Sequence, residues 1–265
     1  MNKIEVVNDN LEKINVSKSI NIEYYKKECA FAISEIKIVA KESADLDIII
    51  NLKDSSKINF SINLCEYVNL NLNIICEGNK GKVQYKYNLC DNSICNVKKI
   101  CNVNGIKEMV IVNLDGINSS INYNFKTMSK EKETYDYHIF HNNISTKSII
   151  KNNGVSNTGD IIYQVSSFIP KDITGCTAIQ NNRIINLNDN NCEILPNLYI
   201  DCDSVEAEHS ALIGKFSDEE IFYIMSRGIT MDLALKLLIR GFLTSDINDK
   251  KIIGYIDKKI LKSWR

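Results

Sequence analysis

The stretch "KINFSINLCEYVNLNLNIICEG" (Lys57–Gly78) decides the fold, because apolar and polar residues alternate through it twice. The first alternating run spans Ile58–Leu64, and after a short interruption a second run spans Val68–Ile74. Successive side chains of an extended chain point to opposite faces, so each run has one apolar and one polar face. Strict alternation over short runs predicts half-buried β-strands.

The same alternation returns from about Ile4 to Gly214, for example in "GKVQYKYNLC", "GDIIYQVSSFI" and "NNRIINLNDNN". Signals for two-residue hairpins are few: Asn104–Gly105, Asp115–Gly116 and the "NNG" that ends at Gly154. A meander of hairpins would show more of them. Many short strands with asparagine-rich corners indicate a β-solenoid, in which each coil buries its face on the next. On this pattern alone a β-sandwich is an equally good interpretation.

After Gly214 the apolar period changes to 3.6 residues, which is typical of amphipathic helices. Ser217–Glu220 reads as a capping box, in which serine and glutamate satisfy each other's backbone donors at a helix start. Thr230 is expected to cap a second helix, and a third is expected from about Asn248. The predicted division is a β domain of residues 1–214 and a small helical domain of residues 215–265.

Composition limits the class of protein and its partners. The 265 residues carry a net charge of −1, which disfavours a nucleic-acid or membrane partner recognised by charge alone. The N-terminal residues show no signal-peptide pattern, and no apolar run approaches the roughly 18 residues of a membrane span. Nine cysteines without an export signal are expected to be reduced, and the protein is expected to be cytoplasmic.

Motifs for enzymatic chemistry are missing from the sequence. It contains no phosphate-binding loop of the G-x-x-x-x-G-K-[ST] type and no C-x-x-C pair. The spacing of Cys90, Cys95 and Cys101 fits neither a ferredoxin nor a zinc pattern well. We therefore expect a protein that is not an enzyme, and any ATP-derived energy would come from a partner.

His209, in "VEAEHSALIG", is the most informative single residue. It shares strand parity with Val205, Ala207, Ala211 and Ile213, so its ring is expected to lie with small and apolar side chains. Such a histidine is either a packed ring, in the solenoid or an interface, or one ligand of a metal whose thiolates come from elsewhere.

Other candidate ligands are fewer. Cys202 is the cysteine nearest to His209 in sequence and is the next candidate. His138 and His141 are three residues apart, so they are predicted to face opposite sides of one strand and not to share a metal.

The segment "EHSALIGKFSDEEIFYIMSRGITMDLALKLLIRGFL" (Glu208–Leu243) resembles the C-terminal signature of the SufB/SufD family, the scaffold subunits of the SUF iron–sulfur cluster assembly machinery. Upstream, "HNNISTKSIIKNNGV" and "PNLYIDCDSVEAEH" resemble the family's two histidine-bearing strands. The likeness covers about Tyr137 to Leu243. It implies a mainly β fold, a right-handed parallel β-helix with C-terminal helices, and so favours the solenoid over the sandwich.

The resemblance also implies partners and a site. Family members pair through the β-helix with a second SufB/SufD-type subunit, as a heterodimer or homodimer, and their C-terminal helices hold the SufC ATPase. Cluster building involves Cys, His and Glu side chains at the dimer interface. The partner-binding residues expected from this are Phe222, Tyr223, Arg227, Leu233, Leu237, Leu238 and Phe242.

Departures from the family pattern refine the expectation. Where SufB-like members have a cysteine after a Thr-Gln pair, this chain has Asn181, and it has Ser210 where they have glutamate. Where SufD-like members have a cysteine two residues before the histidine, this chain has Ala207. The resemblance therefore implies a SufD-like or degenerate SufB-like member with no tightly bound cofactor. The candidate ligands of a transient cluster at a subunit interface are His209, Cys202 and His141. Of these, His141 also matches a family histidine.

Two other functions are compatible with a β-solenoid. A carbohydrate-active β-helix enzyme would need clustered carboxylates along an exposed groove, whereas the outward residues here are mainly Asn, Ser and Lys. A solenoid with a purely structural role in protein interactions is the other alternative, and iron retention beside an ATPase partner would distinguish it from a scaffold.

Overall fold

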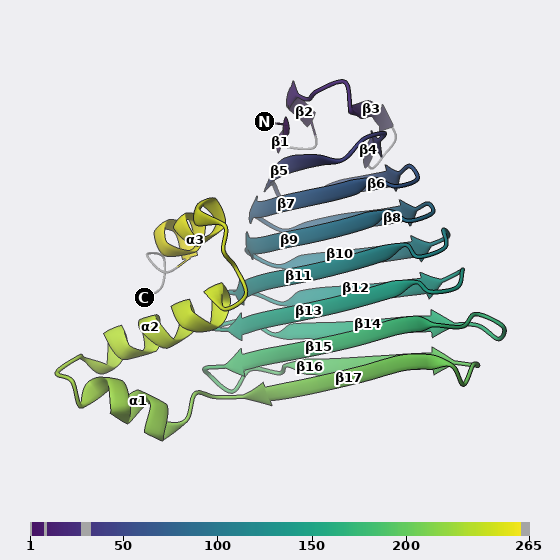
Figure 1. Ribbon diagram of the computed structural model, residues 1–265. Helices are drawn as coiled ribbons and strands as arrows, with labels where there is room; N and C mark the ends of the chain where they lie inside the picture. Colours follow the sequence, from purple (N-terminus) through teal and green to yellow (C-terminus); the bar gives the residue numbers. More distant parts are fainter. Residues whose placement is uncertain (1, 8–9, 28–32, 261–265) are drawn as a thin grey trace.

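The chain forms a two-sided β-solenoid of about seven turns, followed by helices (Figure 1). The computed structural model describes residues 2–7, 10–27 and 33–260. From β4 onward, even-numbered strands belong to an eight-stranded sheet and odd-numbered strands to a nine-stranded sheet. We call the nine-stranded sheet A and the eight-stranded sheet B. From β4 onward, each strand pairs in parallel with the equivalent strand of the next coil, which confirms the predicted parallel solenoid.

The strands of sheet A are β1 (Asn2–Val7), β2 (Asn10–Asn15), β5 (Ala44–Leu52), β7 (Asn69–Gly78), β9 (Ile94–Val103), β11 (Ser120–Ser129), β13 (Lys147–Ser156), β15 (Cys176–Asn186) and β17 (Val205–Gly214). Those of sheet B are β3 (Ile20–Lys27), β4 (Ile33–Ala40), β6 (Ser56–Leu64), β8 (Gly81–Leu89), β10 (Ile106–Leu114), β12 (Glu133–His141), β14 (Ile161–Ile169) and β16 (Glu193–Ile200). The helices are α1 (Asp218–Met225), α2 (Met231–Thr244), α3 (Lys250–Tyr255) and a π-helical turn, η1 (Ile256–Ile260).

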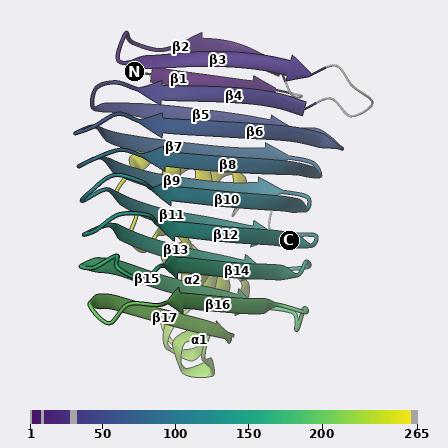
Figure 2. The same ribbon diagram turned by 90° about the vertical axis from the view of Figure 1, so that its right-hand side faces the viewer.

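The first coil departs from the predicted parallel pattern. β2 pairs antiparallel with β1, and β3 pairs antiparallel with β4. The expectation of parallel coils from Ile4 onward is therefore wrong for these two strands. They lie at the ends of the two sheets, where they cover strand edges that a further parallel coil would otherwise have to pair (Figure 2).

The period-two pattern fills the space between the sheets and explains the outward asparagines. Inward side chains form the apolar core, in which Phe60 stacks on Tyr85 with ring centroids 5.1 Å apart. On the outer face of sheet B, the side-chain amide of Asn113 donates to the amide oxygen of Asn88, and that of Asn88 donates to Asn63. Both nitrogen–oxygen distances are 2.7 Å. Identical amides one coil apart therefore satisfy each other along the solenoid axis, as stacked asparagine ladders do.

The predicted hairpin signals have other roles. Asn104–Gly105 forms a corner between sheets A and B, with Gly105 at a φ of 87°. Gly154 lies inside β13, where a Cβ would stand 2.5 Å from the hydroxyl oxygen of Tyr163. That glycine makes room for a packed tyrosine and forms no turn.

α2 and α3 pack on the outer face of sheet A, toward the C-terminal ends of its strands, and α1 packs on α2. The capping box is confirmed: Ser217 caps α1 and Glu220 bonds back to it, and Gly228 adopts a φ of 81° after the helix. α2 begins after Thr230 as predicted, although the threonine side chain makes no capping bond. One apolar cluster joins the sheet to the helices through Ile100, Met128, Val155, Ile185, Ile239, Phe242, Leu243, Ile247, Ile252 and Ile256.

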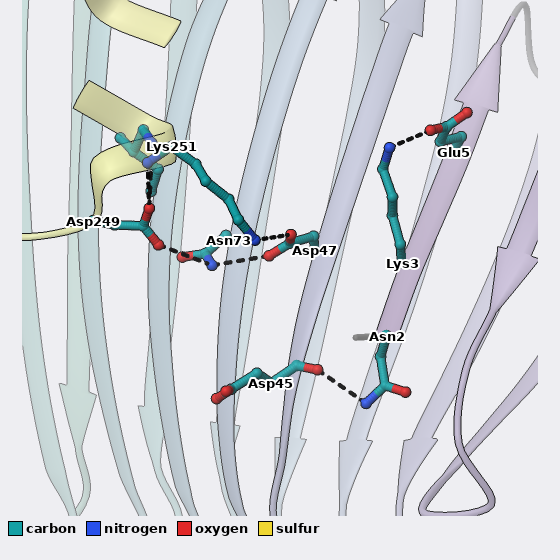
Figure 3. A network of polar contacts seen from close by, with 9 residues as sticks. Asn2, Lys3, Glu5, Asp45, Asp47, Asn73, Asp249 and Lys251 are labelled. Carbon is teal, nitrogen blue, oxygen red and sulfur yellow. Dashed lines mark hydrogen bonds and ion pairs between the residues drawn. The ribbon is translucent and has the colours of Figure 1, made fainter. Parts of the chain in front are cut away.

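α3 is also tied to the solenoid by polar contacts (Figure 3). Asp249 caps α3 through the amides of Lys251 and Ile252, and its carboxylate also accepts from Asn73 of β7. Lys251 reaches Asp47 of β5 at 3.2 Å. In the part of the chain that the structure describes, no helix has the length and apolarity to cross a membrane.

Candidate functional site at the terminal coil

The last coil of the solenoid is uncovered. β16 and β17 end their sheets, so each has a neighbouring strand on one side only among the described residues. A strand edge of this kind presents a row of unpaired backbone donors and acceptors. Large apolar side chains are exposed on the same two strands, namely Leu195, Tyr199, Leu212 and Ile213. The terminal coil is therefore suited to pairing with another chain.

His209 lies in the middle of this uncovered coil. Its Cα is in register with Gln180 of β15, so the two side chains share the inward-facing parity of sheet A. Val205 and Ala207 on that face are partly buried, as expected, whereas His209 and Ala211 are exposed. The ring is therefore not packed inside the solenoid, because no further coil among the described residues covers this part of β17.

Polar side chains lie in the coils next to His209. Gln180 donates to the Ser167 hydroxyl at 2.9 Å and to the Asn197 carbonyl at 3.0 Å. One coil deeper, Asn152 donates to Asn182 at 2.8 Å. Further polar atoms of the same residues are buried without a partner in the described structure. The interior thus changes from apolar in the early coils to polar toward the open end.

Cys202 and His209 belong to the same coil but lie apart. Cys202 is half-buried in the corner that joins β16 to β17, and His209 is the fifth residue of β17. His209 lies four residues along the extended strand from Val205, which places their Cα atoms about 13 Å apart. Within the described residues, no three His, Cys, Asp or Glu side chains lie close enough to hold a metal ion.

His141 does not reach the terminal coil or any surface. It is buried inside the solenoid, with Nδ1 2.8 Å from the Thr146 hydroxyl and Nε2 2.9 Å from the Ser148 hydroxyl. Burial lowers the pKa of the ring to about 4, so it is neutral. The sequence-based assignment of His141 to an interface is corrected accordingly. His138 faces outward on the same strand, as predicted, 3.0 Å from Asp136.

An ionic cluster inside the solenoid was not recognised from the sequence. Lys99 of β9 contacts Glu108 of β10, and both side chains are fully buried. Glu133 of β12 accepts hydrogen bonds from Thr127 at 2.7 Å and from Tyr135 at 2.9 Å. Burial raises the pKa of Glu133 to about 8. The alternation in "ICNVKKICNV" already places Lys99 on the inward face, so the signal was present.

The helices α1 and α2 expose an apolar surface, which we define as Phe222, Tyr223, Met231, Leu233 and Leu237. We call it the helix surface. None of the residues of α1 is buried, and Phe222 is 73% exposed. Within the described residues, Phe222 and Tyr223 of α1 are thus left uncovered.

Three other residues predicted for this surface differ in position. Arg227 lies beside it, with its guanidinium 4.6 Å from the centre of the Tyr223 ring, and Leu238 is half-buried. Phe242 is a correction: it is buried in the cluster between helices and sheet A, against Arg183. Its ring is thus largely withdrawn from the helix surface.

Comparisons with known proteins agree on one family. The family model described as "SUF system FeS cluster assembly, SufBD core domain" matches residues 24–242. An iron–sulfur cluster assembly SufBD family protein of Mycobacterium leprae is 34% identical over 104 residues, 38% of this chain and 26% of the relative. The iron–sulfur cluster assembly protein SufD of Bacillus subtilis is 27% identical over 140 residues, 49% of this chain and 32% of the relative. The chain thus spans about a third or less of the length of these relatives.

Proposed function

Because the chain belongs to the SufBD family of the SUF iron–sulfur cluster assembly system, we propose that it is a scaffold subunit of that system. The observation that carries the proposal is the uncovered terminal coil with His209 exposed at its centre. A second SufB/SufD-type subunit would pair with the edges of β16 and β17 and cover their exposed apolar side chains. Edge pairing supplies backbone hydrogen bonds, and the apolar side chains supply buried area.

The cluster under assembly would be cargo held between the two subunits. His209 offers one imidazole nitrogen, whereas an iron–sulfur cluster takes about four ligands. The second subunit would therefore supply the missing ligands. Asn181 of β15 lies opposite Ser210 of β17 in the parallel pairing of these strands. The preceding pair in the same register is Gln180 and His209. Neither Asn181 nor Ser210 has a thiolate or carboxylate, which supports a SufD-like or degenerate SufB-like role in which the partner contributes most of the chemistry.

The helix surface is the proposed docking site for a SufC-type ATPase. Its side chains are apolar and exposed. α2, which carries three of them, is anchored to sheet A through Ile239, Phe242 and Leu243, and α1 packs on α2. A hollow of about 280 Å³ lies beside it, lined in part by Phe216, Ile221 and Leu235. A partner helix or loop that covers Phe222 and fills this hollow would bury apolar area on a rigidly held element. ATP-driven movement of the ATPase could then be transmitted to the solenoid.

The first prediction tests the role of His209. We expect His209→Ala to leave the chain folded and paired with a co-expressed SufB/SufD-type subunit, because the ring is exposed and contributes little packing. Cluster formation by the assembled complex should fall, measured as iron and sulfide retained per complex. Glu208→Ala, on the opposite face of β17, is the matched control and should retain the cluster. A stoichiometric cluster on the chain alone that survives His209→Ala would contradict this role.

The second prediction tests the helix surface. We expect the double variant Leu233→Asp/Leu237→Asp to abolish co-purification of a co-expressed SufC-type ATPase, because two charges would have to be buried without partners. The double variant Met109→Asp/Ile144→Asp, at two exposed apolar positions away from the helices, controls for the two added charges. Circular dichroism would establish that all variants are folded. Retained ATPase in Leu233→Asp/Leu237→Asp would place the docking site elsewhere.

A further inference from the structure

A groove lies at the corner of the solenoid where strands of sheet A end and strands of sheet B begin. Its volume is about 700 Å³, within the range of about 300–1,000 Å³ that is usual for small-molecule sites. It lies over the coils of β6, β8, β10 and β12, at least two coils from the terminal strands β16 and β17. It is thus separate from the edge proposed to pair with a second subunit.

Differences in corner length produce the groove. The corners 53–55 and 130–132 have three residues, whereas the two between them, 79–80 and 104–105, have two. The longer corners form the walls at the two ends, and Gly81 and Gly105 also line the groove. Across the groove, Lys80 of the corner 79–80 forms an ion pair with Glu131 of the corner 130–132. The ammonium nitrogen and the carboxylate oxygen are 2.7 Å apart.

The groove concentrates positive charge. Five lysines line it against two carboxylates, a surplus of three positive charges in a chain whose net charge is −1. Three of the lysines lie at equivalent positions of the adjacent strands β6, β8 and β10, namely Lys57, Lys82 and Lys107. Their side chains therefore point outward side by side, one from each strand, and we call this row the lysine ladder, with each strand as one rung. Their spacing is about 4.8 Å per rung, and like charges directly opposite each other destabilise a sheet.

Carboxylates of the described residues compensate little of the charge of Lys82, Lys107 and Lys132. In this part of the structure no ion pair joins Lys82, Lys107 or Lys132 to a carboxylate, and Glu131 is already paired with Lys80. An anion in the groove would relieve the repulsion along the ladder. Three rungs span only about 10 Å, and the longer corners bound the groove at both ends, so a short anion fits better than a polymer that needs an open track.

We propose that this groove binds a small phosphate compound with at least two negative charges, of the size of a triphosphate or a nucleotide. The ammonium groups of Lys82 and Lys107 would donate to phosphate oxygens from adjacent rungs, and Lys132 would close the site from the wall. Lysine acts in such sites as a flexible point charge that several phosphate oxygens can share. The inference is independent of the scaffold function, and its failure would leave that proposal intact.

Isothermal titration calorimetry of the full chain at low ionic strength tests the proposal. Inorganic tripolyphosphate is the first probe, and ATP is the second. We expect saturable 1:1 binding of tripolyphosphate. Equal affinity for the two probes would support a site for phosphate alone, and tighter ATP binding would support a nucleotide. No saturable binding at millimolar tripolyphosphate would overturn the proposal.

Variants localise the binding. Lys82→Gln/Lys107→Gln should weaken tripolyphosphate binding by about tenfold or more, because two charge-assisted hydrogen bonds are lost. Lys86→Gln/Lys147→Gln removes the same charge from exposed positions outside the groove and should change the affinity less than about twofold. Equal losses in both double variants would show non-specific attraction and overturn the proposal, as would clear preference for a single-stranded oligonucleotide over tripolyphosphate.

Discussion

Replacing Lys99 with methionine is expected to lower the free energy of unfolding by about 3–5 kcal/mol. Lys99 and Glu108 contact each other deep inside the solenoid, and neither side chain is exposed. The Lys99 ammonium also lies 4.8 Å from the centre of the Tyr85 ring and 5.1 Å from that of Phe125. Methionine fills a similar volume but leaves the Glu108 carboxyl without its cation. That carboxyl must then stay as an uncompensated buried charge or take up a proton, and both are costly.

The double variant Lys99→Met/Glu108→Met separates the pair from its surroundings. Two apolar side chains of similar volume need no partner, so most of the lost stability should return. Chemical denaturation of the wild type, both single variants and the double variant would give the coupling energy. If the double variant is as unstable as Lys99→Met, the lysine stabilises the solenoid through its ring contacts and not through Glu108.

Glu133 is expected to lower the stability of the chain progressively as the pH rises from about 4.5 to about 8, and Glu133→Gln should remove this contribution. The carboxyl of Glu133 has a pKa of about 8 in the folded chain, against an ordinary value of 4.5. Between these values the folded state keeps a proton that the unfolded state has released. Through Glu133 alone, unfolding therefore becomes more favourable with rising pH, by on the order of 3–5 kcal/mol across the window.

Glutamine imitates the protonated carboxyl, and its amide oxygen can still accept from Thr127 and Tyr135. Glu133→Gln should thus match the wild type near pH 5 and exceed it in stability near pH 8.5. Urea denaturation at several pH values measures this, with Glu131→Gln, an exposed neighbour, as the control. Parallel pH profiles for the wild type and Glu133→Gln would show that Glu133 is ionised in the folded state throughout.

Much of the fold could be predicted from local pattern, because strand alternation and helix capping are local properties. The alternation in Lys57–Gly78 placed Ile58 to Leu64 on the inward face of β6, and the structure confirms it. The capping box of Ser217 and Glu220 located the start of α1 to the residue. The parity of "VEAEHSALIG" likewise fixed which side of β17 carries His209.

The environment of each candidate residue depended on contacts between distant parts of the chain. Phe242 and Leu237 lie on the same helix and look alike in sequence, but Phe242 is buried against sheet A and Leu237 is exposed. The choice between them depends on where α2 lies on the strands of four coils.

The candidate sites divide in the same way. The sequence by itself determined that His209 and His141 lie on strands, that His209 shares its face with small and apolar side chains, and that His141 faces away from His138. Only the tertiary structure decided that His141 is enclosed and His209 open, because β17 is the last strand of its sheet. The ladder of Lys57, Lys82 and Lys107 also needed the fold. These lysines are 25 residues apart and become neighbours only because the lengths of strands and corners add up to equal coils. Local patterns set the face of a side chain, whereas its neighbours follow from how the coils stack.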